Sequence, residues 1–146
     1  MPDERETEVR KFAKSQHATR LHILSVVTPF RAAQDRFVLL ERGEMVMLVA
    51  CVDCPFRAPM ARGEPQPLAP AKLEQFLKAL APLAVETLDD YFPEGAHDGT
   101  TIVFERLDES GYLQIAMLDP PKRSKHSRLV SAWTRTFPAV RAVLGR

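Results

Sequence analysis

The cysteine pair in residues 51–54, with sequence CVDC, is the sharpest chemical candidate in the chain. Two thiolates at this spacing can share one zinc ion, or exchange electrons when a helix N-terminus lowers the pKa of one thiol. A zinc site needs further ligands, and the four histidines are scattered without paired spacing. In a redox-active motif a helix follows the cysteine pair directly, whereas here Pro55 begins a proline-rich stretch. We therefore expect Cys51 to pack as a buried strand residue, Cys54 to be incidental, and no metal or cofactor to be bound.

The basic stretch at residues 122–128, with sequence KRSKHSR, is a second candidate. Its cationic side chains could bind phosphate, and Arg135 lies seven residues beyond Arg128, on nearly the same face of the following helix. No aromatic residues are interleaved for base stacking, and the net charge of the chain is +1. A solvated loop, or a patch for an acidic protein partner, is therefore favoured over nucleic acid. The candidate partner-binding residues of this stretch are Lys122, Arg123, Lys125 and Arg128.

Three methionines could add an adaptable apolar surface for a partner, because thioether chains fit varied shapes. They are Met45, Met47 and Met117. The favoured alternative is that they fill the core, which is the common packing role of methionine. The same core role is expected for Trp133 and Phe137.

An enzyme would need a recognisable set of reacting groups, and the sequence contains no nucleophile elbow and no glycine-rich phosphate loop. The pairs Asp89-Asp90 and His97-Asp98 flank a turn and could be assembled into an acid–base pair. Adjacent residues on a helix point different ways, and turns are commonly acidic, so solvated turn residues are the better interpretation. We expect no catalytic site and no enzyme activity.

Length and composition indicate one globular domain. The chain has 146 residues, of which 45% are hydrophobic and 27% charged, enough to bury roughly two-thirds of the unfolded surface. The N-terminus is charged where a signal peptide would be apolar, and no run reaches the roughly 18 apolar residues of a membrane span. Two cysteines three apart do not make a disulfide framework, which agrees with a reducing compartment. The expected location is the cytoplasm.

The secondary structure is organised around residues 36–53. Two apolar runs, residues 37–40 and 45–52, are joined by a turn containing Gly43, which predicts a β-hairpin. The second run is apolar at nearly every position, so both faces of that strand should be covered. Residues 21–30 form a strand candidate before it, and the short links favour an antiparallel meander.

The remaining segments predict helices on either side of a second hairpin. Asp3 can cap a helix to about Ala18, whose thin apolar stripe predicts a surface helix. After a proline-rich loop at residues 55–70, an amphipathic helix over residues 73–91 should be kinked or split by Pro82. Strands at residues 101–107 and 112–118 follow, and a last helix forms despite Pro138. The predicted fold is α+β, an antiparallel sheet of about five strands with helices packed on it, in the order α-β-β-β-α-β-β-α.

This order resembles the type III secretion chaperone fold of small bacterial proteins that hold an unfolded stretch of a secreted partner. The nearest sequence echo is GTTIVF at residues 99–104 and GYLQI at residues 111–115, followed by a helix that ends in apolar residues. The resemblance implies a homodimer with a partner chain laid along apolar surface or a sheet edge.

The function expected from the sequence is therefore a protein-binding module, secretion-chaperone or adaptor-like, that holds a segment of a secreted effector. The alternative is an immunity protein that blocks a toxin enzyme by presenting acidic side chains to a basic cleft. The acidic residues expected to make such contacts are Glu41, Glu44, Asp89, Asp90 and Glu94.

Overall fold

The computed structural model describes residues 3–55, 60, 62–95 and 99–144. Six strands form one sheet in the order β4-β3-β2-β1-β5-β6, and all neighbours pair antiparallel. The strands are β1 (Arg20–Val27), β2 (Ala33–Arg42), β3 (Met45–Pro55), β4 (Gln66–Pro67), β5 (Thr101–Asp108) and β6 (Gly111–Leu118). The predicted α+β class and antiparallel sheet are confirmed. The additional strand, β4, has two residues and lies at the edge of the sheet, inside the segment predicted to be a loop. Proline is tolerated there because an edge strand has no neighbour on one side and needs no backbone hydrogen bond toward it.

The predicted hairpin is formed by β2 and β3, and Arg42 pairs with Met45 beside its turn. Gly43 has a φ of +60°, in the left-handed region that favours glycine. Successive side chains of β3 enter opposite layers: Leu48 joins the core on the α2 side, and Val49 joins the core on the α1 side. Both faces of β3 are covered, as the continuous apolar run predicted.

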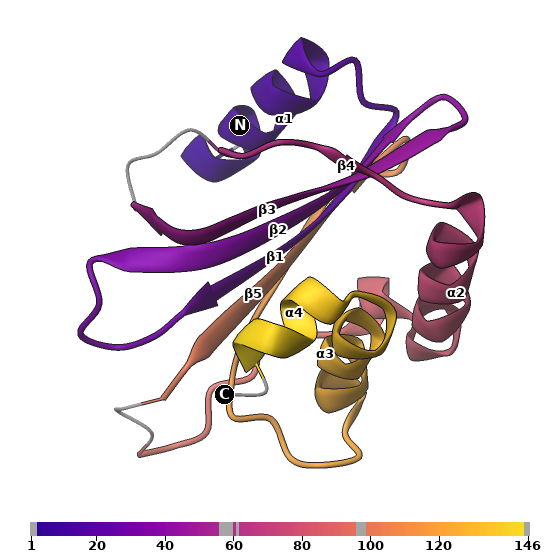
Figure 1. Cartoon of the computed structure of the whole chain (residues 1–146). Coiled ribbons are helices and arrows are strands. Elements are labelled where there is room, and N and C mark those ends of the chain that lie inside the picture. Colours follow the sequence, from indigo (N-terminus) through magenta and orange to yellow (C-terminus); the bar gives the residue numbers. More distant parts are fainter. Residues whose placement is uncertain (1–2, 56–59, 61, 96–98, 145–146) are drawn as a thin grey trace.

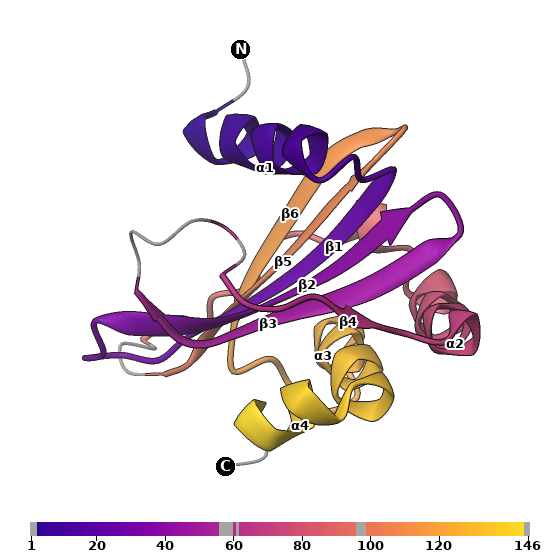
Figure 2. The same ribbon diagram turned by 45° about the horizontal axis from the view of Figure 1, so that its top comes forward.

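Helices cover the two faces unequally (Figures 1 and 2). Helix α1 (Glu4–Ser15) lies on one face, and α2 (Pro70–Leu80), α3 (Lys125–Thr136) and α4 (Pro138–Leu144) lie on the other. Pro82 splits the predicted middle helix, as expected. Helix α2 ends at Leu80, and two short 3-10 turns follow it, η1 (Ala81–Leu83) and η2 (Val85–Thr87). Pro138 divides the predicted last helix, since proline is accepted at the first helical position but not inside.

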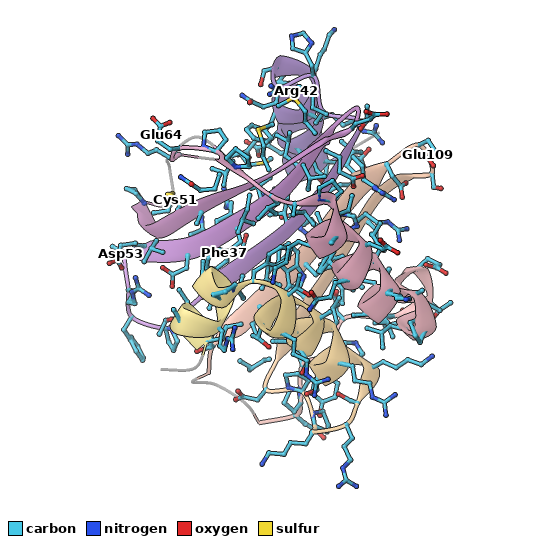
Figure 3. The ribbon with its side chains drawn as sticks, turned by 45° about the vertical axis from the view of Figure 1, so that its right-hand side comes forward. Phe37, Arg42, Cys51, Asp53, Glu64 and Glu109 are labelled. Atoms are coloured by element: carbon cyan, nitrogen blue, oxygen red, sulfur yellow. A yellow bond between two sulfur atoms is a disulfide. The ribbon has the colours of Figure 1, made fainter. Side chains whose placement is uncertain are left out.

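An aromatic cluster holds α2 and α3 on the sheet. The Phe76 ring of α2 packs edge-on against Trp133, with ring centroids 4.8 Å apart, and it also contacts Phe137 at 5.5 Å. Beneath it lies His22 of β1, at 5.2 Å. Trp133 and Phe137 are buried, as expected, and Figure 3 shows Phe37 of β2 in the same layer between the sheet and the helices.

Helix α1 is held more firmly than its thin apolar stripe predicted. Val9 is completely buried, and Arg5 makes two hydrogen bonds of 2.8 Å to the carboxylate of Glu105 on β5. Glu105 is 1% exposed and also accepts a 2.6 Å hydrogen bond from the Tyr112 hydroxyl. Burial, followed by this bond, raises the pKa of Tyr112 above its ordinary value. The prediction missed this tether because Arg5 and Glu105 are far apart in sequence.

Candidate functional site

A groove of about 410 Å³ lies between the end of α2 and the outward side of α3. The inward faces of both helices are committed to the Phe76–Trp133 contact, so the groove is built from the residues beside those faces. We call it the α2–α3 groove. It is lined by Gln75, Ala79, Pro82, Leu83, Arg128, Ser131, Ala132, Arg135 and Thr136.

The α3 side of the groove follows from helical periodicity. Ser124 caps the helix by accepting a 3.1 Å hydrogen bond from the Ser127 amide to its Oγ. Leu129 and Trp133 then point into the core, whereas Arg128 and Arg135 point into the groove. The seven-residue spacing therefore brings these two arginines to one face, as the sequence predicted.

The α2 side was not recognised from the sequence. Gln75 and Ala79, one helical turn apart, line the groove, and the break at Pro82 brings Pro82 and Leu83 into it. The break was predictable. Its pairing with α3 was not, because it depends on how the two helices pack. The Lys72 ammonium holds them together by donating a 3.2 Å hydrogen bond to the Thr136 carbonyl.

The groove combines a small apolar floor with unpaired positive charge. Leu83 and Ala132 are buried at its base, and Arg128 and Arg135 are exposed at its rim. Within the described ranges, neither guanidinium has an ion-pair partner or a hydrogen bond. A free guanidinium presents a planar fork of donors that fits a carboxylate with two parallel hydrogen bonds. The chemistry that this groove suits is an acidic segment with small apolar side chains.

The other basic candidates precede Arg128 in the sequence and do not line the groove. Lys122, Arg123 and Lys125 are all exposed in the link into α3 and its first turn. His126 is not part of this basic surface, because its Nε2 lies 2.6 Å from the Asp89 carbonyl oxygen and anchors the loop after η2. The predicted basic stretch is thus a run of exposed cations that ends at Arg128.

The three methionines do not form a common surface. Met117 is completely buried and Met47 is 7% exposed, so both are core residues and a partner surface on them is contradicted. Their strand positions explain this, because β3 and β6 are covered on the faces where they point. Met45 is 56% exposed on the hairpin between β2 and β3, outside the groove.

The cysteines are joined as a disulfide, Cys51–Cys54. The expectation that Cys54 is incidental is wrong, since both residues are buried and bonded. The disulfide lies where the pairing of β2 with β3 is irregular, and Asp53 there has a φ of 54°. Figure 3 shows Cys51 and Asp53 at the opposite end of the β2–β3 hairpin from Arg42. In the described part of the chain, no group of three or more His, Cys, Asp or Glu residues could hold a metal ion. His97 and Asp98 lie outside that part.

Two of the acidic residues proposed for toxin contacts have internal partners. Glu41 is buried and accepts two hydrogen bonds from Arg20, one of them 2.8 Å long. Asp90 accepts a 2.8 Å hydrogen bond from the Ala116 amide at the edge of β6. The acidic set therefore does not form a single free surface.

Comparison with protein-family models and with curated proteins gave no match. No helix in the described ranges is both long and apolar enough to cross a membrane. The class that the fold and the site define is an α+β domain with a cationic groove between two helices on one face of an antiparallel sheet.

Proposed function

We propose that the protein is a protein-binding module, of the secretion-chaperone or adaptor kind, that holds an acidic segment of a partner protein in the α2–α3 groove. The observation that carries this proposal is that the guanidinium groups of Arg128 and Arg135, above an apolar floor, have no partner among the residues that the structure describes. Charged groups at such a rim guide association and select partners of opposite charge. The exposed cations Lys122, Arg123 and Lys125 would also attract the acidic segment of the partner as it binds.

The spacing of the two arginines suggests the form of the bound segment. Seven residues of helix advance by about 10 Å at 1.5 Å per residue. A chain in the polyproline II conformation advances by about 3.1 Å per residue with three residues per turn, so acidic residues three positions apart would lie on one side and meet both arginines. This suits an unfolded stretch of a secreted partner, as the chaperone resemblance implies. The homodimer that the resemblance implies is retained as part of the proposal.

Two other kinds of partner are less well supported. Nucleic acid would be expected to use aromatic side chains for stacking, and none lines the α2–α3 groove. A toxin held by acidic contacts would need free carboxylates, but Glu41 and Asp90 are already bonded within the chain. An acidic protein segment therefore remains the preferred ligand.

Reversing both charges in the groove should abolish partner capture. In co-purification from the native host, followed by mass spectrometry, the wild type is expected to retain one stoichiometric partner, and Arg128→Glu/Arg135→Glu to retain at least tenfold less. The reason is that each lost charge-assisted contact is replaced by repulsion of the partner's carboxylates, and even one such bond contributes about 1.5–3 kcal/mol. Light scattering on the same samples reports whether the protein is a dimer.

The matched control is Lys11→Glu/Lys14→Glu, which makes the same change of net charge on exposed positions of α1, across the sheet from the groove. This variant should retain the partner. Equal loss in both variants would show that total charge, not the groove, controls binding. Failure of the wild type to capture any chain would contradict stable protein binding.

A further inference from the structure

A second cavity, of about 500 Å³, opens at the end of the sheet where β1 finishes and β5 begins. It lies between the sheet and the two C-terminal helices and shares no lining residue with the α2–α3 groove. We call it the sheet-end cavity. Its apolar lining consists of Val26, Ile102, Pro120, Val130, Val143 and Leu144. Small-molecule sites in proteins commonly have this size and this mainly apolar character.

The charged side chains that line the sheet-end cavity are more negative than positive. The Arg31 guanidinium pairs with two carboxylates, those of Asp35 and Asp53, and is therefore more than neutralised. Asp35 is 1% exposed and is fixed further by a 2.9 Å hydrogen bond from the Asp53 amide to its Oδ1. Asp119 also lines the cavity, is exposed, and has no hydrogen bond or ion pair with any residue in the described ranges. Among the side chains that line the cavity, Asp35 and Asp119 carry two negative charges and Arg31 carries one positive charge, so the lining has one excess negative charge.

We propose that the sheet-end cavity binds a small amphiphilic cation. Its apolar body would pack against Ile102, Val130 and Leu144, and its ammonium group would lie beside the Asp119 carboxylate. An anion of the same shape would be repelled by the excess negative charge of the lining. An uncharged molecule would cover Asp119 without compensating its charge, which costs free energy.

Two probes with the same ten-carbon chain and opposite charge test this proposal on the full-length protein. We expect decyltrimethylammonium, titrated calorimetrically below its micelle concentration, to bind at one site per chain, and sodium decanoate to bind at least tenfold more weakly. Asp119→Asn should weaken the binding of the cation about tenfold, because it removes a negative charge from the cavity lining. Glu44→Gln, the same kind of change at the exposed β2–β3 turn, should have no effect.

A second variant tests the cavity itself. Val143→Trp fills the space on the α4 side and should abolish binding of the cation, while circular dichroism reports that the fold is kept. The groove variant Arg128→Glu/Arg135→Glu should bind the cation like the wild type, which separates this site from the proposed protein-binding function. Equal affinity for both probes, undiminished binding by Asp119→Asn or Val143→Trp, or no binding of the cation would each overturn the proposal.

Discussion

Replacing Phe76 with alanine is expected to lower the free energy of unfolding by about 4 kcal/mol. Phe76 is completely buried and contacts Trp133, Phe137 and His22 within one cluster. Its removal would leave a cavity between α2, α3 and the sheet that these rigid rings cannot fill. Because the same ring fixes α2 against α3, the α2–α3 groove should also lose its shape, and partner capture should fall.

Urea denaturation followed by Trp133 fluorescence measures this effect. Lys78→Ala, at an exposed position of the same helix, should change the free energy of unfolding by no more than about 0.5 kcal/mol. A loss below about 1 kcal/mol for Phe76→Ala would mean that the aromatic cluster does not hold α2 in place.

The second large effect expected is a loss of stability in acid caused by His22. Burial first, and then the positive charges of Arg20 and Arg106, lower the pKa of His22 from 6.5 to about 3. Its Nδ1 has no hydrogen-bond partner among the described residues, so nothing there stabilises an added proton. Above pH 6.5 the imidazole is neutral in both states. Below pH 6.5 the unfolded chain takes up a proton that the folded chain refuses, so stability falls as the pH falls toward 3.

The size of this effect is about 1.4 kcal/mol per pH unit, or about 5 kcal/mol by pH 3. The measurement is the free energy of unfolding of the wild type and of His22→Leu between pH 7 and pH 4. The acidic side chains titrate in both proteins, so the difference between the two curves isolates the imidazole. Parallel curves would show that His22 is protonated in the folded protein at ordinary acid pH.

Much of the sheet could be predicted because its signals are local. The apolar runs around Gly43 predict the hairpin, and Pro82 predicts the break after α2. By contrast, β4 is only two residues long and contains a proline, so it carries no periodic signal of its own. The bond from Arg5 to Glu105 joins elements 100 positions apart, and only the folded chain shows it.

The candidate site was predictable on one side only. The spacing of Arg128 and Arg135 places both on one helical face, whatever that face meets. The opposite wall depends on where α2 ends and how it packs on α3, which no local pattern determines. The methionines show the same limit, since Met45 and Met47 have the same residue type and differ only in what covers them.

Hydrogen exchange of the protein with and without its captured partner tests the central claim most directly. If the partner segment lies in the α2–α3 groove, amides of residues 79–83 and 128–136 should exchange more slowly in the complex, and those of the β2–β3 turn should be unchanged. Protection confined to the β2–β3 turn, to the edge of β6 or to α1 would contradict binding in the groove.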